Sequence, residues 1–182
     1  MNIVERFHAL GRRARPGTKF SKPLTKIIIH WIGAYPNQNV GDPWNWLENG
    51  NGVGVQASYH FIVKDKSVLQ SLPLNEIGLH SGDIRNHESI GIGVIPMNAE
   101  GQFSKETEDT LRLLIKHIRD TTGIQLPLER HHDGTQKKDC PRYYTEINDQ
   151  IGVDGRVANP PGGDERWKDL VLFLNDFDRA VS

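Results

Sequence analysis

The sequence predicts an α/β fold, a single domain with a central mixed β-sheet flanked by helices. Short apolar runs rich in β-branched residues, such as Ile27-Ile28-Ile29, indicate buried strands. Two longer segments, residues 103–122 and 164–180, repeat apolar residues at helical spacing. The chain of 182 residues has 36% apolar side chains and no internal repeat, which suits one domain with an ordinary core.

Several short segments are predicted to be extended. They are residues 27–29, 58–64, 67–69, 89–95 and 124–130. Asp65-Lys66 is a plausible tight turn between the second and third of them. The first ends directly on His30, and the last ends at His131 and His132. In residues 89–95, apolar residues alternate with glycines, which is typical of a central strand.

The clearest helix covers residues 103–122. Ser104 can cap its start, and acidic residues fill its first turn. Its apolar face is formed by Leu111, Leu114, Ile115 and Ile118. Gly123 stands where the end of a helix is expected.

The remaining segments are predicted from turn residues and helix breakers. Residues 37–55 are rich in Asn, Gly, Pro and Trp, which predicts a long surface loop with a short helix near residues 44–47. The breaker Pro160-Pro161-Gly162-Gly163 ends a flexible insertion at about residues 145–163. Asp164 is then predicted to cap a closing helix at about residues 164–180.

Residues 1–22 are predicted to form a basic N-terminal arm, ahead of the main domain at residues 23–182. Its cations are Arg6, Arg12, Arg13, Arg15, Lys19 and Lys22. Phe7, Leu10 and Phe20 give the arm apolar points that could pack on the domain. Either the arm packs and leaves a solvated basic face, or it presents a patch for anionic polymers.

Composition excludes several classes of protein. The formal net charge of −1 is not that of a nucleic-acid-binding basic protein. No segment approaches the roughly 20 apolar residues that span a bilayer, so we expect no membrane insertion. The N-terminus lacks the apolar stretch of a secretion signal. One cysteine cannot form an intrachain disulfide, and we expect a monomer.

Two histidine positions and the cysteine form a possible metal site. His30 and the pair His131-His132 each follow a predicted strand, and Cys140 comes eight or nine residues after that pair. Two imidazoles and a thiolate are good zinc ligands, and three protein ligands leave a fourth position for water. Taken singly, however, His30 could be a hydrogen-bonded core histidine and Cys140 a small buried hydrophobe.

Six motifs then occur in a characteristic order. They are Lys26-Ile27-Ile28-Ile29-His30, Tyr59-His60-Phe61-Ile62-Val63, Leu79-His80-Ser81-Gly82, Ser89-Ile90-Gly91-Ile92, Arg130-His131-His132-Asp133 and Lys138-Asp139-Cys140-Pro141. Together they resemble the type 2 N-acetylmuramoyl-L-alanine amidases, a family that includes phage endolysins and shares its fold with peptidoglycan recognition proteins. The resemblance covers roughly residues 26–144, and the closing helix corresponds to the family's last helix.

The resemblance implies Zn²⁺ held by His30, His131 and Cys140. His131 with Asp133 fits the family pattern of a histidine, any residue and an acidic residue. The spacing to the cysteine in other members would instead select His132, which is kept as the alternative. If His131 is the ligand, His132 is expected to point to the other side of the strand.

The resemblance also implies two catalytic residues, Tyr59 and Lys138. Either could stabilise the oxyanion that forms when zinc-bound hydroxide attacks the amide, and Tyr59 could instead orient or deprotonate the water. Some relatives carry a catalytic glutamate where this chain has Gly93. If neither residue is catalytic, Lys138 is a solvated lysine in a loop, and Tyr59 is a strand aromatic that packs on its neighbours.

Substrate contacts are implied for His80 and Trp31. His80 resembles a histidine in the substrate groove, although it could equally be a structural loop residue. Trp31, Trp44 and Trp46 could stack on sugar rings or simply pack in the protein.

The implied function is zinc-dependent hydrolysis of the amide bond between N-acetylmuramic acid and L-alanine in bacterial peptidoglycan. The protein would be a phage or prophage endolysin, made in the host cytoplasm without a signal peptide and acting on the cell wall after release. One alternative is a peptidoglycan-binding module without activity. Another is a cysteine hydrolase with Cys140 as the nucleophile and His131 or His132 as the base.

Overall fold

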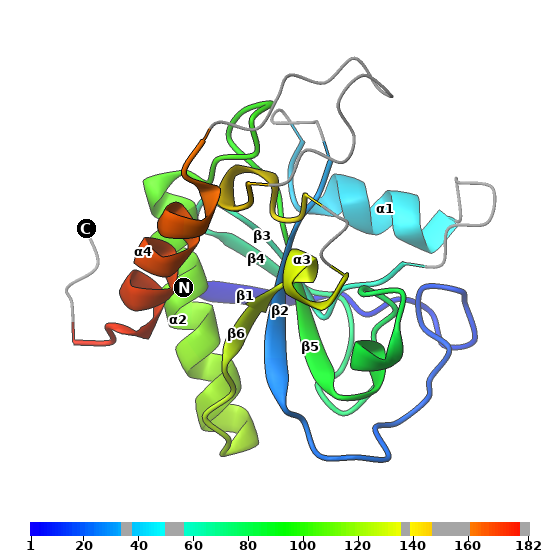
Figure 1. Ribbon diagram of the computed structural model, residues 1–182. Coiled ribbons are helices and arrows are strands. Elements are labelled where there is room, and N and C mark those ends of the chain that lie inside the picture. Colours follow the sequence, from blue (N-terminus) through cyan, green and yellow to red (C-terminus); the bar gives the residue numbers. More distant parts are fainter. Residues whose placement is uncertain (34–37, 50–56, 136–138, 147–160, 179–182) are drawn as a thin grey trace.

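Six strands form one mixed sheet in the order β1-β4-β3-β5-β2-β6. The computed structural model describes residues 1–33, 38–49, 57–135, 139–146 and 161–178 (Figure 1). The strands are β1 (Asn2–Glu5), β2 (Lys26–Trp31), β3 (Phe61–Lys64), β4 (Ser67–Gln70), β5 (Ser89–Val94) and β6 (Leu128–Arg130). Only β3 and β4 pair antiparallel, and the other neighbours in this sheet are parallel.

Helices cover both faces of this sheet. They are α1 (Gly41–Asn49), α2 (Lys105–Thr122), α3 (His131–Thr135), α4 (Gly163–Asn175) and the short 3₁₀ helices η1 (Ile84–His87) and η2 (Arg142–Tyr144). Figure 1 places α2 and α4 on one side of the sheet and α1 on the other. The predicted α/β class, with one domain and a mixed sheet between helices, is confirmed.

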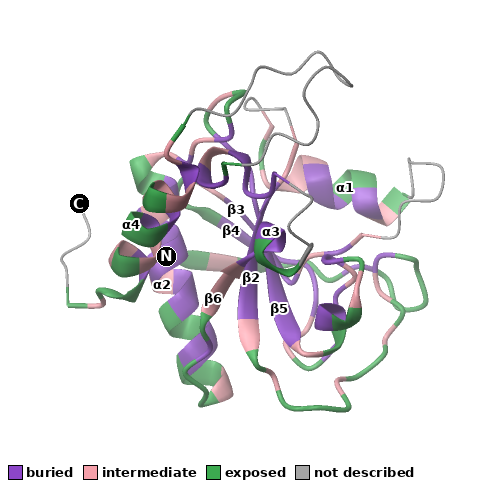
Figure 2. Cartoon of the chain, viewed as in Figure 1, coloured by how far each residue is buried: buried purple, intermediate pink, exposed green. Residues whose placement is uncertain are grey.

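The alternation of side chains along the strands gives the two faces different roles. Ile27, Ile29 and Trp31 of β2 join the main core with the apolar faces of α2 and α4. Ile28 and His30 point to the opposite face. There a smaller core, made of Trp44, Ile62, Leu69 and Ile95, packs beneath α1. Figure 2 shows the buried residues concentrated along the central strands. The sheet face that carries the smaller core therefore also carries His30.

The long helix follows the sequence prediction closely. The hydroxyl of Ser104 accepts a hydrogen bond from the N–H of Thr107, which caps the start of α2. Gly123 adopts a left-handed conformation, φ 69°, directly after the last helical residue. The short helix near residues 44–47 is also present, as part of α1.

Two predicted strands are shorter than the apolar pattern suggested. Strand β3 begins at Phe61 rather than residue 58, because the carbonyl of His60 accepts from both Ser71 and Leu72 and the chain bends there. Strand β6 begins only at Leu128. Before it, Pro127 has no N–H, and the N–H of Leu126 turns back to the carbonyl of Ile124.

The first residues of the N-terminal arm are more ordered than a polar arm suggests. Residues 2–5 form the edge strand β1, which pairs parallel with β4. Further along the arm, Phe20 packs against the main core, whereas Leu10 stays 69% exposed. The guanidinium of Arg15 forms two hydrogen bonds with the carboxylate of Glu76, at 2.7 and 2.9 Å. The arm is thus joined to the domain by main-chain and ionic contacts.

The closing helix differs from the prediction at both ends. Its N-cap residue is Gly162, with φ 86° and no side-chain hydrogen bond, so the prediction that Asp164 caps it was wrong. The carboxylate of Asp164 instead pairs with Arg130, which follows from its position in the first turn facing β6. Helix α4 ends at Asn175. Most of the predicted insertion, residues 147–160, lies outside the described residues.

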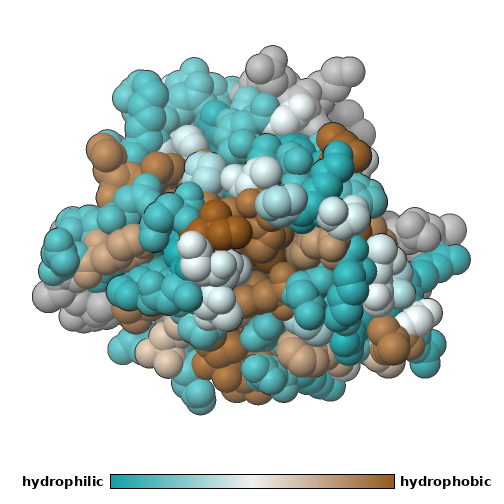
Figure 3. All heavy atoms as spheres, turned by 90° about the horizontal axis from the view of Figure 1, so that it is seen from below, coloured by the Kyte–Doolittle hydropathy of each residue, from teal (hydrophilic) through white to brown (hydrophobic). Residues whose placement is uncertain are grey.

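The surface is mixed in character. The face seen in Figure 3 is mostly hydrophilic around its edge, with hydrophobic residues gathered near its centre. Strongly exposed apolar side chains, such as Leu10, Ile84 and Leu172, lie in different segments of the chain. Within the described ranges, no helix combines the length and apolar character that a membrane crossing requires.

We predict that Glu76→Gln lowers the free energy of unfolding by about 1–3 kcal/mol at neutral pH, because it removes a buried charged acceptor from Arg15 and Lys19. Arg15 in particular lowers the pKa of Glu76 to about 2, so its contribution is present above the ordinary carboxyl pKa and is lost as the pH falls. Urea denaturation should therefore show a gap from wild type that narrows below a pH of about 5.

Glu165→Gln is the matched control, because it removes an exposed carboxylate from its contact with Lys168. The free energy of unfolding of this variant should equal that of the wild type at every pH, within the error of the measurement. An equal loss in both variants, or a Glu76→Gln gap that stays constant down to low pH, would contradict a stabilising role for the Arg15 contact.

Candidate metal centre

The candidate site lies where β2 and β6 end, side by side at one edge of the sheet. The two strands are parallel, and Ile29 is in register with Arg130. The next residue on each strand path is His30 on β2 and His131 at the start of α3. Since parallel neighbours end at the same edge, two histidines that are distant in sequence become adjacent in space. Their ring centroids are 4.6 Å apart.

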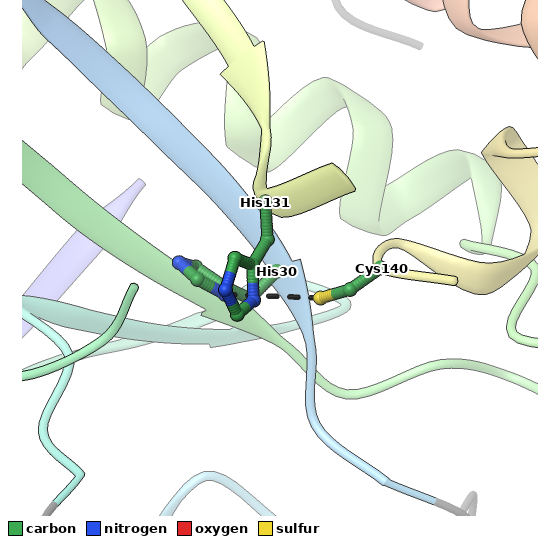
Figure 4. Close-up of side chains that lie close together, drawn as sticks. All are labelled: His30, His131 and Cys140. Carbon is green, nitrogen blue, oxygen red and sulfur yellow. Dashed lines mark hydrogen bonds between the residues drawn. The ribbon is translucent and has the colours of Figure 1, made fainter. Parts of the chain in front are cut away.

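Cys140 completes the group from the segment that follows α3. The N–H of His132 donates to the carbonyl of Cys140 at 2.9 Å, which holds this segment against the helix. Figure 4 shows the side chains of His30, His131 and Cys140 converging, and all three are buried. Their potential ligand atoms lie within 4.8 Å of one another, and the Cys140 sulfur is 3.7 Å from His30 Nδ1. Two imidazoles and one thiol at this spacing fit a tetrahedral zinc ion with one open position.

The second histidine of the pair is placed differently from His131. His132 is buried, but it is not part of the convergent group found among the described residues. It lies in the first turn of α3. The expectation that it points to the other side of a strand was therefore wrong, because β6 ends at Arg130 and the chain turns into a helix.

Hydrogen bonds orient the two convergent imidazoles. Nε2 of His131 is 2.9 Å from the carbonyl of Ser81. A carbonyl only accepts, so His131 carries its proton on Nε2 and keeps a lone pair on Nδ1. Nε2 of His30 is 3.0 Å from Nδ1 of His80. Both histidines thus use Nε2 toward the protein, which leaves Nδ1 for a ligand.

His80 lies beneath the convergent group rather than on an open surface. Only 6% of the residue is exposed, and its two ring nitrogens face His30 and the hydroxyl of Ser89. Burial lowers the pKa of His80 to about 3, so the ring is neutral at physiological pH. Whether it contacts substrate stays a prediction.

Tyr59 lies two residues before β3 and borders the site beside His30. Its ring is tilted against His30 with centroids 5.2 Å apart, and the residue is half-buried. Burial, and then the neighbouring Cys140, raise the pKa of Tyr59 above that of a free phenol. A Cβ at Gly93 would lie 2.6 Å from Ile32 and 2.9 Å from Tyr59. Position 93 is where some relatives carry a catalytic glutamate. In this chain the space that its side chain would need is occupied by Ile32 and Tyr59.

The other predicted residues have different outcomes. Lys138 lies outside the described residues. Trp31 is buried in the main core and also lines a cavity of about 480 Å³ together with Tyr59 and Trp46. Trp46 is 44% exposed there. Trp44 packs instead, because its indole N–H donates to the carbonyl of Arg6 at 2.6 Å.

Sequence reasoning missed the polar loop between residues 80 and 89. The side-chain oxygen of Asn86 accepts hydrogen bonds from the N–H groups of both His80 and Ser81. It also accepts from the hydroxyl of Ser81. The available signal was the density of Ser, Asp, Arg and Asn between two predicted strands. Such a density also suits a solvated loop, so the pattern alone does not identify a support for the site.

Comparison with known proteins places this geometry in a family. The N-acetylmuramoyl-L-alanine amidase family matches residues 20–143. The amidase XlyA of Bacillus subtilis (strain 168) is 32% identical over 160 residues, which cover 85% of this chain and 52% of XlyA. The amidase CwlH of the same organism is 37% identical over 91 residues, covering 47% of this chain and 35% of CwlH. The chain thus spans about half or less of the length of these two relatives.

Solved structures share the fold. The catalytic domain of XlyA matches with a TM-score of 0.70 at 24% identity, covering 96% of this chain and 100% of that domain. A mutant endolysin from Bacillus subtilis matches with a TM-score of 0.69 at 25% identity, covering 96% and 99%. The family match over residues 20–143 shows that the chain belongs to the N-acetylmuramoyl-L-alanine amidase family.

Proposed function

We propose that this chain is a zinc-dependent amidase that hydrolyses the bond between N-acetylmuramic acid and L-alanine in bacterial peptidoglycan. The observation that carries the proposal is the buried convergence of His30, His131 and Cys140. Membership of the amidase family supplies the reaction and the substrate class.

Each ligand residue has a defined part in this proposal. His30 and His131 would bind through Nδ1, because Nε2 of each is hydrogen-bonded within the protein. Cys140 would bind as the thiolate. Zinc in such a site acidifies water to a pKa of about 7 and polarises a carbonyl. All three side chains are buried.

Tyr59 is proposed to act on the scissile carbonyl. Its phenol keeps its proton at neutral pH, because burial raises its pKa further above the ordinary value. It can therefore donate a hydrogen bond to the oxygen on which negative charge develops, and it is a poor base. Lys138, two residues before Cys140 in sequence, is proposed to stabilise the same charge.

The cavity beside Tyr59 is proposed to hold the glycan part of the substrate. Trp46 presents an exposed indole there, and Trp31 lines the same cavity from the strand end. Aromatic and apolar side chains next to a few polar groups are typical of pockets that bind small molecules. We further propose that the protein is an endolysin, as is the Bacillus subtilis protein of similar structure. It would be made in the host cytoplasm and act on the wall as a monomer after release.

One second function has a specific observation in its favour. The Cys140 sulfur and His30 Nδ1 are 3.7 Å apart, which also suits a thiol nucleophile and its base. The nearby His131 favours the metal site, because its imidazole is a third donor atom for a metal, which a cysteine hydrolase does not need. A peptidoglycan-binding module without activity is disfavoured, because all three donors are retained.

We expect the purified protein to release new L-alanine amino termini from peptidoglycan, and a chelator to abolish this release until zinc is added back. The physical reason is that zinc, held by His30, His131 and Cys140, would supply the activation of the attacking water. Activity that persists after complete chelation would point to the thiol mechanism. New reducing sugar ends without new amino termini would indicate a glycosidase.

We expect His131→Ala to lose bound zinc and His132→Ala to retain it, because only His131 belongs to the convergent group. Metal content per chain, measured on both purified variants, separates the two residues. Near-native circular dichroism of each variant controls for unfolding. Loss of zinc from His132→Ala alone would reverse the ligand assignment.

Tyr59→Phe is expected to lower kcat by about 10²–10³-fold with zinc content unchanged, because it removes one donor to the developing oxyanion. Tyr143→Phe is the matched control, since the Tyr143 ring packs against the Arg166 guanidinium and lines a different cavity from the one that Tyr59 lines. Steady-state kinetics on soluble muropeptides measures both. Full activity in Tyr59→Phe would remove Tyr59 from the mechanism.

A further inference from the structure

A single loop contacts both convergent histidines from behind. The carbonyl of Ser81 accepts from Nε2 of His131, and Nδ1 of His80 faces Nε2 of His30. His80 and Ser81 are consecutive, whereas each histidine that they contact is 50 residues away in sequence. The hydrogen-bond partners of the two imidazoles therefore come from two consecutive residues.

The direction of each hydrogen bond behind His30 can be assigned. The hydroxyl of Ser89 donates to the carbonyl of Arg85, which can only accept. The Ser89 oxygen is then the acceptor for Nε2–H of His80, at 3.4 Å. This leaves a lone pair on Nδ1 of His80, which accepts from Nε2–H of His30 at 3.0 Å.

These hydrogen bonds determine the tautomer of His30 at the candidate metal site. With its proton held on Nε2, His30 has its lone pair on Nδ1, the atom that lies 3.7 Å from the Cys140 sulfur. The chain of hydrogen bonds from Arg85 through Ser89 and His80 thus selects the tautomer that can bind a metal.

The position of His80 is itself tightly determined. Its backbone N–H and that of Ser81 both donate to the side-chain oxygen of Asn86, at 2.9 and 2.8 Å. On strand β5, a Cβ at Gly91 would lie only 2.4 Å from Cγ of His80. The imidazole therefore lies directly against the backbone of Gly91. Any residue with a Cβ at position 91 would collide with the ring.

We propose that His80 is a positioning residue for the metal site, which fixes the tautomer and orientation of His30, rather than a residue that contacts substrate. Both of its ring nitrogens are occupied within the protein, and it is buried. This inference rests on the proposed zinc amidase function. Ligand histidines generally need such a partner on their other nitrogen, and loss of the partner weakens metal affinity by about 10–100-fold.

Two amide variants of His80 test the acceptor. In His80→Asn the side-chain oxygen can take the place of Nδ1 and accept from His30, whereas in His80→Gln the amide extends toward Ser89 and no longer offers Nε2–H of His30 this acceptor. We expect His80→Gln to bind zinc about 10–100-fold more weakly than wild type, and His80→Asn to recover most of the affinity. Competition with a chromophoric chelator measures both, and absorption spectra of the cobalt-substituted proteins report the ligand geometry.

His8→Gln is the matched control, because His8 is also fully buried and hydrogen-bonded, to Glu48, but in the N-terminal arm. It should lower stability without changing zinc affinity. If both His80 variants fail to fold, Gly91→Ala provides the second test, since it displaces the His80 ring without changing its chemistry. It should also weaken zinc binding.

The outcomes separate the inference from the function. Wild-type protein that binds no zinc would refute the proposed function itself. Wild type that binds zinc while His80→Gln binds it equally well would refute only the positioning role. Equal weakening in His80→Asn and His80→Gln would also refute it, because the effect would then not depend on the acceptor. A selective loss in His80→Gln, with an altered cobalt spectrum, supports it.

Discussion

The parallel pairing of β2 with β6 is the constraint on which the candidate site depends. It aligns Ile29 with Arg130, so that the residues immediately after them, His30 and His131, meet at one sheet edge. Cys140 is 110 residues from His30 in sequence and reaches the same point only because its segment folds back onto α3. A shift of β6 by one residue would turn its side chains to the opposite face and separate the two imidazoles. The apolar core behind β2 thus fixes the geometry of the polar site in front of it.

The two faces of the central strands explain how a polar cluster can be buried without disrupting the core. On β5, Ile90, Ile92 and Val94 face the main core, while Gly91 and Gly93 alternate with them toward the site. Added side chains at these two glycines would collide with His80 and with Ile32 and Tyr59, respectively. The strand therefore supplies apolar packing on one side and space for functional rings on the other.

Residues whose role depends on local sequence were predictable. Ser104 and Gly123 bound α2 as expected, because capping depends on neighbours within a few residues. Asp164 failed as a cap because Arg130, 34 residues away, binds its carboxylate. Strand β1 was missed because its polar flanks carry no alternating pattern, and its partner β4 is distant in sequence. The motif order indicated His30, His131 and Cys140, but spacing alone could not choose between His131 and His132. That choice depends on where β6 ends and α3 begins.

The role of His80 was beyond sequence reasoning for a related physical reason. A histidine in a polar loop can contact substrate or support another residue, and composition is the same in both cases. What distinguishes them is which nitrogen donates, and that follows from an acceptor-only carbonyl at Arg85, three hydrogen bonds away from the metal site. Because buried imidazole nitrogens need partners, this short chain of bonds leaves one tautomer of His30 satisfied. The same loop holds His131 through the carbonyl of Ser81, so both histidines have a hydrogen-bond partner in consecutive residues of one loop. The backbone of Cys140 is held instead by the N–H of His132, which lies outside that loop in sequence.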